Sequence, residues 1–286
     1  MQVTAHARAK RRQLFESLIL HTLLLIGLAI SMFPFYWMVI GSLLGRGQIF
    51  VVPPNLWLKG PPVWANYAAV FEKTNFATGF LNSCFVTFTT TFSILLFSAM
   101  AGFAFAKYDF PGRDGLFLFL LGTMMIPGVV TLIPGFMVIV KMGWVDTYQA
   151  LIVPGLVSAF GTFLMRQYMF NISDELIDAA RIDGAGDFRL FFQIALPISV
   201  PAVTSLAIFT FFGGWNSLIW PLIIIRTKPH YTLPLTLILL QSRFPLHVDY
   251  SVVFAASFMA TVPTLLVFFF LQRHFVSGIQ TGALKG

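Results

Sequence analysis

The polar residues with the clearest arrangement occupy one segment, residues 174–197, which lies between two long apolar stretches. A connector that rests on lipid usually carries Lys and Arg on its polar face, and acidic groups are unfavourable beside an anionic leaflet. This segment is mainly acidic, so docking against a soluble protein is favoured over an amphipathic connector lying on lipid. Its charged residues are Asp174, Glu175, Asp178, Asp183 and Asp187, against Arg181 and Arg189.

Local signals predict a helix–turn–helix in this segment. Ser173 can cap the first helix, and Asp174 and Glu175 then occupy its positive first turn. The Asp183-Gly184 pair ends this helix, because glycine readily adopts the left-handed conformation that follows a helix C-terminus.

The second helix is expected to be capped by Asp187 and to run from Phe188 to about Leu196. Pro197 then marks the turn into the next apolar stretch. Apolar side chains of this helix are expected to rest on the rest of the protein, namely Phe191, Phe192 and Ile194.

No other group of residues has the spacing of a catalytic or metal site. The chain has no Gly-x-x-x-x-Gly-Lys-Ser/Thr loop, so ATP binding through a P-loop is not expected. Its one cysteine, Cys84, cannot form an internal disulfide, and the five histidines are scattered. We therefore expect a protein that is not an enzyme and that binds no cofactor or metal itself.

The acidic segment resembles the EAA motif of permease subunits in binding-protein-dependent ABC importers. That motif reads Glu-Ala-Ala, two residues, Asp-Gly-Ala, five residues, Phe, two residues, Ile, one residue, Leu-Pro. Asp178 stands in place of the first glutamate and is one methylene shorter. Every other fixed position matches, at Ala179, Ala180, Asp183, Gly184, Ala185, Phe191, Ile194, Leu196 and Pro197.

Further segments resemble the carbohydrate branch of these permeases, the MalG-like subunits. They are Trp215-Asn216, Trp220-Pro221-Leu222, Thr232-Leu233-Pro234-Leu235 and the C-terminal Thr281-Gly282-Ala283-Leu284-Lys285-Gly286. The resemblance covers essentially the whole chain and is least specific in residues 42–78.

The resemblance implies several partners. They are a second, homologous permease, two ABC ATPase subunits that bind ATP and Mg, and an extracytoplasmic solute-binding protein. In the family the EAA segment is a coupling helix that inserts into a cleft of the ATPase. This implies coupling roles for Asp178, Ala179, Ala180, Asp183, Gly184 and Ala185, and possible ATPase contacts of the tail at Gly278, Thr281 and Lys285.

The composition indicates that lipid solvates most of the chain. Of its 286 residues, 57% are hydrophobic and 10% are charged, whereas soluble domains carry about 25% charged residues. The apolar runs are continuous rather than alternating, which favours helices over a barrel. We predict an all-α polytopic membrane protein, to which the resemblance adds the type I importer (MetI-like) fold. Six transmembrane helices are expected, near residues 18–40, 79–105, 115–140, 147–168, 199–225 and 250–272.

The basic residues predict the orientation. With the N-terminus in the cytoplasm, eleven of the 18 Lys and Arg residues fall on the inner side. Both termini and the acidic segment are then cytoplasmic, in a bacterial inner membrane. The net charge of +7 is thus attributed to topology and anionic lipid rather than to nucleic acid.

The predicted organisation has four parts. A cytoplasmic tail, residues 1–17, precedes the first transmembrane helix and an extracytoplasmic loop, residues 18–78. The core permease domain, residues 79–272, includes the coupling segment 171–198. Residues 273–286 form a cytoplasmic tail.

The predicted spans are nearly free of charge, whereas ion-coupled transporters often place acids or histidines there. An energy source outside the bilayer and a neutral, hydroxyl-rich solute are therefore expected. Prolines can bend the spans around a pathway, and the best candidates are Pro127 and Pro134. Polar and aromatic residues that could line such a pathway, or merely bridge and fill the bundle, are Asn82, Thr89, Trp215, Asn216 and Trp220.

Together these observations predict a permease subunit of an ATP-driven importer for a sugar or oligosaccharide. Another polar solute, such as a polyol phosphate, is the alternative within the family. An ion-coupled secondary transporter and a membrane enzyme of lipid or glycan metabolism are the alternatives from other classes.

Overall fold

The computed structural model describes residues 2–242 and 248–283, with side chains for residues 13–241 and 248–272. No β-strand occurs in these described ranges, which confirms the all-helical class. The longer helices are α1 (Gln2–Leu43), α2 (Ala65–Lys73), α3 (Phe76–Lys107), α4 (Arg113–Met124), α5 (Gly128–Lys141), α7 (Ala159–Phe170), α8 (Asp174–Ile182), α11 (Val200–Trp215), α13 (Leu233–Ser242) and α14 (Tyr250–Ala283). The shorter ones are α6 (Tyr148–Ile152), η1 (Val153–Gly155), α9 (Asp187–Arg189), η2 (Leu190–Ala195), α10 (Leu196–Ile198), α12 (Ile219–Ile224) and η3 (Lys228–His230).

The chain divides into two compact units. The first comprises residues 1–73 and 244–259, and the second comprises residues 74–243 and 260–286. Within the first unit, Nδ2 of the buried Asn66 donates hydrogen bonds to the carbonyl oxygens of Ser42, at 2.8 Å, and Leu44, at 2.9 Å. These bonds satisfy carbonyl groups at the C-terminus of α1 and attach α2 to it.

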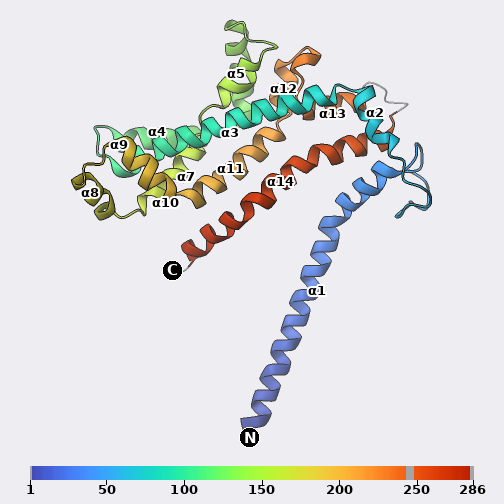
Figure 1. Cartoon of the computed structure of the whole chain (residues 1–286), viewed down its shortest axis with the longest axis horizontal. Helices are drawn as coiled ribbons and strands as arrows, with labels where there is room; N and C mark the ends of the chain where they lie inside the picture. The colour runs from blue at the N-terminus through green and yellow to red at the C-terminus, as the bar shows by residue number, and fades with distance from the viewer. Residues whose placement is uncertain (1, 243–247, 284–286) are drawn as a thin grey trace. The chain divides into compact units, whose positions relative to one another are not determined.

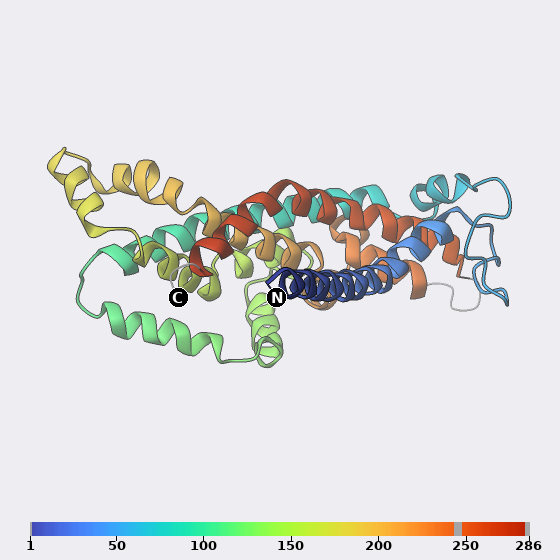
Figure 2. The ribbon, with the colours of Figure 1, turned by 90° about the horizontal axis from the view of Figure 1, so that it is seen from below.

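Five stretches of the described chain are long and apolar enough to cross a membrane. They are Gln13–Leu43, Phe76–Lys107, Tyr148–Phe170, Val200–Ile224 and Tyr250–Gln272. A sixth crossing is reached if α4 and α5, which meet at an angle of 98°, count as one span. Figure 2 shows this bend between green α4 and yellow-green α5.

The expected third span, residues 115–140, corresponds to this bent pair, and the bend lies at Pro127, one of the two prolines named as candidates. The helix stops at Met124, and Pro127 has a non-helical ψ of 131° immediately before α5 begins at Gly128. Proline has no N–H to donate and disfavours a helical conformation in the residue before it. Pro134, the other candidate for a bend, lies inside α5.

The core of the second unit forms where α3 packs along α7 and α11. The two helices approach closely at Gly102 of α3, where a Cβ atom would lie 2.8 Å from the backbone nitrogen of Arg166 in α7. Small residues allow such close helix packing inside membranes. Met165, Met169 and Leu206 are fully buried in this core. In Figure 1, α8 and α9 lie beyond one end of α3, and α12 and α13 lie toward its other end.

Candidate functional site

The first half of the acidic segment folds as its sequence predicts. Ser173 Oγ accepts the backbone N–H of Leu176 at 3.3 Å and so caps α8. The helix ends before Asp183, and Gly184 has a φ of +81°. The Ala185 N–H then bonds to the Ala180 carbonyl oxygen at 2.9 Å, which closes the turn.

The second half differs from the prediction in two respects. Gly186, not Asp187, occupies the capping position, because the Asp187 carboxylate is used elsewhere and accepts the Tyr108 hydroxyl at 2.6 Å. The α-helix is also only three residues long, and residues Leu190–Ala195 form a π-helix.

The wide π-helical turn decides which aromatic side chains reach the core. Phe191 is buried, with its ring 5.7 Å from that of Phe103 in α3, and Ile194 packs against the same core. Phe192 is 46% exposed, so the expectation that it rests on the core is wrong. Leu190, Phe191 and Ala195 fill the inner face, and position 192 therefore points outward.

The six residues of the EAA core divide between two faces of the segment. Ala180 and Ala185 are half-buried against the core, behind the buried Ile177. The outer face contains four exposed residues, namely Asp178, Ala179, Asp183 and Gly184. This division leaves the acidic positions accessible to another protein, and their coupling role stays a prediction.

Two exposed apolar side chains, which the sequence reasoning did not single out, flank this acidic face. Ile182 is 87% exposed and Phe188 is 73% exposed. The sequence signal for them was the presence of large apolar residues in an otherwise polar segment. Exposed apolar residues that form a patch mark contact surfaces for another protein or for the membrane.

A lysine fastens the segment to the membrane helices. The side chain of Lys107, at the end of α3, is 3% exposed, and its Nζ lies 2.6 Å from Asp174 Oδ1. The same ammonium donates to the carbonyl oxygens of Ile172 and, at 3.4 Å, Phe170. It therefore lies at the negative end of α7 and the positive end of α8, where each helix terminus needs hydrogen-bond partners. We call this set of contacts the Lys107 latch.

Tyr108 provides a second attachment, to the turn after α8. Its hydroxyl donates to Asp187, and the guanidinium carbon of Arg181 lies 5.4 Å from the centre of its ring. Burial, followed by the hydrogen bond to Asp187, raises the pKa of Tyr108. The phenol therefore stays protonated at physiological pH and remains a donor.

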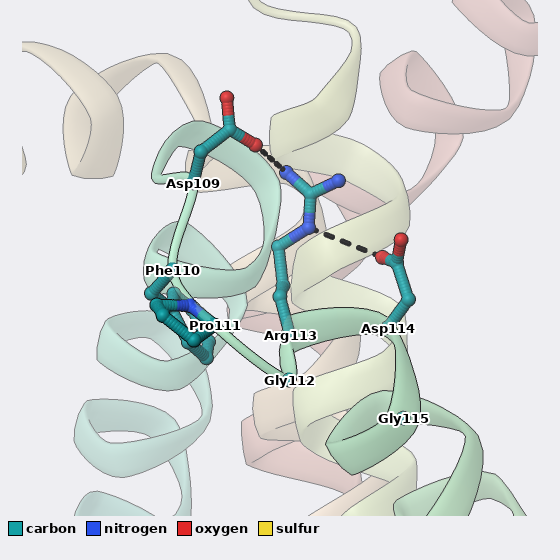
Figure 3. Close-up of a pocket in the computed structure, with 7 residues that line it drawn as sticks. All are labelled: Asp109, Phe110, Pro111, Gly112, Arg113, Asp114 and Gly115. Atoms are coloured by element: carbon teal, nitrogen blue, oxygen red, sulfur yellow. Dashed lines mark hydrogen bonds and ion pairs between the residues drawn. The ribbon is translucent and has the colours of Figure 1, made fainter.

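The loop after Tyr108 neutralises its own charges. Figure 3 shows Arg113 between Asp109 and Asp114, with Nε 3.1 Å from Asp114 Oδ1. Residues 109–115 line a hollow of about 510 Å³. Because each charge has a partner in the same loop, the hollow offers no unpaired group to a ligand.

The other end of α3 borders a cavity of different character. It has a volume of about 500 Å³ and lies between α3, α5, α6, α11 and α12, within the second unit. None of the described residues that line it carries a charge. Serine and threonine hydroxyls form much of its polar wall, at Ser83, Thr87, Thr90, Thr131, Thr210, Ser217 and Thr232.

Of the five residues predicted to line a pathway, only Trp220 lines this described cavity. Asn82 is buried and joins two loops, since its Nδ2 donates to Pro229 O at 2.7 Å and its Oδ1 accepts the Tyr148 hydroxyl at 2.7 Å. Trp215 is buried, and its indole N–H donates to Ala260 O at 3.0 Å.

Asn216 and Thr89 also lie away from the cavity wall. Asn216 is exposed and donates to the carbonyl oxygen of Phe212 at 3.0 Å, and Thr89 is half-buried. The pathway roles of all five residues stay predictions.

An aspartate organises the loops beyond the cavity. Asp146 has a φ of +63°, and its Oδ1 accepts the backbone N–H groups of Arg226, at 2.9 Å, and Thr227, at 3.1 Å. His230 Nδ1 lies 3.4 Å from the same oxygen. Burial would raise the pKa of Asp146, but the hydrogen bonds from Thr227 and Arg226, together with His230, lower it overall.

The predicted tail contacts and the question of a metal site complete the description of the site residues. Lys285 lies outside the described residues, and Gly278 and Thr281 lie where only the backbone of α14 is described. Within the described chain, no group of three or more His, Cys, Asp or Glu residues is arranged to hold a metal ion.

Comparison with known proteins shows which family this chain resembles. The family described as "Binding-protein-dependent transport system inner membrane component" matches residues 94–281. The arabinooligosaccharide permease protein AraQ of Halalkalibacterium halodurans is 35% identical over 94% of this chain and 98% of its own length. The sn-glycerol-3-phosphate permease protein UgpE of Yersinia pestis is 32% identical, covering 91% of this chain and 94% of its own. The lactose permease protein LacG of Rhizobium radiobacter is 31% identical, covering 96% and 98%.

A solved structure supports the fold. A chain of a bacterial ABC transporter that imports the acidic polysaccharide alginate superposes with a TM-score of 0.82 at 21% identity, covering 91% of this chain and 96% of that one. The match confirms the importer-type transmembrane fold that the EAA resemblance implied. The family match spans most of the chain and the relatives span nearly all of it. The chain therefore belongs to the inner membrane components of binding-protein-dependent transport systems.

Proposed function

We propose that this chain is the permease subunit of an ATP-driven importer for a sugar or oligosaccharide that an extracytoplasmic binding protein delivers. Relatives named for arabinooligosaccharides and lactose support the solute class. A polyol phosphate is the second candidate, favoured by the relative named for sn-glycerol 3-phosphate. In this proposal a homologous permease and two ATPase subunits complete the complex, and ATP and Mg bind to the ATPases.

The acidic segment is the proposed coupling element, facing the cytoplasm together with both chain termini. The observation that carries this proposal is the Lys107 latch, because one buried ammonium group contacts α3, α7 and α8. A push on the exposed face of α8 is then transmitted to the ends of two membrane helices. Asp178 and Asp183 provide acidic contacts for the ATPase, beside Ile182 and Phe188.

A pair of glycine variants tests this role. Gly184 and Gly186 both have open space where a Cβ would be, but only Gly184 has a positive φ. Valine at position 184 is therefore strained, whereas valine at 186 is tolerated. Gly184→Val is expected to abolish ATP-driven uptake and to reduce recovery of the ATPase with the affinity-purified permease.

Gly186→Val is the matched control and is expected to retain both properties. Normal uptake and normal ATPase recovery with Gly184→Val would contradict the coupling role. Uptake driven by an ion gradient in liposomes that contain this chain without an ATPase would instead support a secondary transporter.

A further inference from the structure

We propose that the hydroxyl-lined cavity beside α3 is a solute-binding site that accepts a neutral polyhydroxylated solute and rejects anions. This inference rests on the proposed transport function and specifies its solute. The cavity volume of about 500 Å³ falls in the usual range of small-molecule sites, roughly 300–1,000 Å³.

The first argument comes from the direction of the wall's hydrogen bonds. Three threonines of the wall donate their hydroxyl hydrogens to carbonyl oxygens of the preceding helical turn. Thr90 Oγ1 donates to Val86 O at 2.8 Å, Thr131 Oγ1 to Gly128 O at 2.8 Å, and Thr210 Oγ1 to Leu206 O at 2.8 Å. A hydroxyl that has donated its one hydrogen retains only acceptor capacity. These positions therefore offer acceptors to a molecule in the cavity.

The one indole in the wall also has its donor occupied. Trp220 Nε1 donates to the carbonyl oxygen of Ala150 at 2.9 Å, which fixes the ring at the cavity wall. Its aromatic surface remains as an apolar contact for the C–H face of a sugar ring. Apolar walls with a few placed polar groups are typical of sites that orient small ligands.

Thr232 supplies the second, independent observation. Its side chain is 4% exposed and lines the cavity, and its Oγ1 has no hydrogen-bond partner among the described residues. Buried hydroxyls are rarely left unpaired, because desolvation without a partner is unfavourable. Thr232 Oγ1 is itself buried behind the cavity wall, so a solute hydroxyl pairs with it once the side chain rotates toward the cavity.

These features discriminate between solute classes. A sugar hydroxyl can donate to the acceptors of the wall, whereas a phosphate or carboxylate at neutral pH is negative and accepts only. No described basic side chain lines the cavity to balance that charge. Burying an unpaired anion is strongly unfavourable. The cavity therefore favours a neutral saccharide over a polyol phosphate or an acidic sugar.

The test measures equilibrium binding to the complete importer in nanodiscs, without the binding protein. Radiolabelled arabinotriose, lactose and sn-glycerol 3-phosphate are the probes. We expect at least one neutral probe to bind and the phosphate not to bind. Thr232→Val is expected to weaken binding of the neutral probe by about 2- to 10-fold, the effect of one lost hydrogen bond. Thr91→Val is the matched control, because Thr91 is also buried with an unpartnered Oγ1 in the described structure but does not line the cavity.

A second variant fills the cavity without removing a hydrogen bond. Gly213 lines it, and a Cβ there meets nothing within 4 Å, so Gly213→Leu is expected to fold and to abolish binding. Gly122→Leu is the control, since Gly122 has equally open space outside the cavity. Binding of the phosphate probe, absence of neutral binding, or wild-type affinity in both cavity variants would overturn the inference.

A further measurement, ATP-driven uptake by the same wild-type complex with its binding protein, distinguishes failure of the proposed transport function from failure of the cavity assignment. Failure to transport any of the probes would count against the proposed function. Transport of a neutral probe that is unchanged by Thr232→Val and Gly213→Leu would overturn the cavity assignment alone.

Discussion

At its C-terminal end α3 carries the Lys107 latch and Tyr108, whereas its N-terminal half borders an uncharged cavity. The first region pairs a side chain that is 3% exposed with a carboxylate that is 83% exposed. The second region has no charged side chain among the residues described there, and its polar side-chain groups are hydroxyls and the indole N–H of Trp220. One helix therefore carries a charged attachment point for the acidic segment at its end and a neutral wall along its other half.

The largest effect is expected when the Lys107 latch at the C-terminal end of α3 is removed. Lys107→Met keeps the apolar part of the side chain but removes the donor to Asp174, Ile172 and Phe170. Because Asp174 is mostly exposed, the loss arises mainly from the carbonyl oxygens, about 1.5–3 kcal/mol. We expect a lower melting temperature of the purified complex and uncoupled ATP hydrolysis without uptake.

Lys73→Met is its control, because the side chain of Lys73 is 53% exposed in its ion pair with Asp249, whereas that of Lys107 is 3% exposed. An equal fall in melting temperature for both variants would show that the Lys107 contacts have no special role.

The next largest effect is expected at Asp146, whose carboxylate lies in the loops beyond the uncharged cavity. Asp146→Ala leaves the N–H groups of Arg226 and Thr227 without their acceptor and places alanine at a positive φ, which together cost about 1–2 kcal/mol. Asp146→Asn keeps an acceptor and tolerates that φ, so it should be milder. Thermal unfolding of the two variants at neutral pH measures the difference.

The pH dependence at Asp146 has a definite sign. Its folded pKa is below the ordinary value of 3.8, so its contribution is complete above pH 3.8 and is lost as pH falls through the lower folded pKa. The stability advantage of the wild type over Asp146→Ala should therefore shrink only below about pH 4. A constant advantage down to pH 2 would contradict this assignment.

A smaller effect is expected at Tyr108. Tyr108→Phe removes one hydrogen bond to Asp187, a loss of about 0.5–1.5 kcal/mol, and leaves the ring under Arg181. The folded pKa of Tyr108 is raised, so the bond contributes fully below pH 10 and is lost as pH rises through the folded pKa. Ultraviolet titration should show one tyrosine that ionises later in the wild type and is absent from the variant.

The smallest effect is expected in the self-neutralised loop. Arg113→Gln removes a guanidinium whose partners, the carboxylates of Asp109 and Asp114, are 94% and 78% exposed, so water screens both pairs. Uptake and melting temperature should both match the wild type. A marked loss of uptake would instead assign this loop to the contact surface for the ATPase.

The sequence predicted the parts of the site that depend on neighbouring residues. Ser173 caps α8 and Gly184 ends it, because both signals act within one helical turn. The π-helix was missed because it depends on the packing of Phe191 against Phe103, 88 positions away in the chain. The 98° angle was not predicted, because Pro127 indicates a bend but not the packing that sets its size.

The roles of Asn82, Trp215 and Lys107 were not predicted, because their hydrogen-bond partners are distant in the sequence. Asn82 and Trp215 were expected to be candidates for a pathway, yet their polar atoms bond to Pro229 and Ala260, far along the chain. Lys107 was assigned only to topology, since nothing near it in the sequence indicates the carbonyl groups of Phe170 and Ile172.

The contact between Lys107 and Phe170 also bears on the direction in which the apolar helices run. Together with the bond between Tyr148 and Asn82, it shows that the stretches Phe76–Lys107 and Tyr148–Phe170 run in the same direction. Two consecutive spans with the same polarity require a return leg between them. Residues 108–147 are all described, and α4 and α5 are their only helices. The bent pair supplies that return leg within the structure, which agrees with counting α4 and α5 as the sixth candidate span.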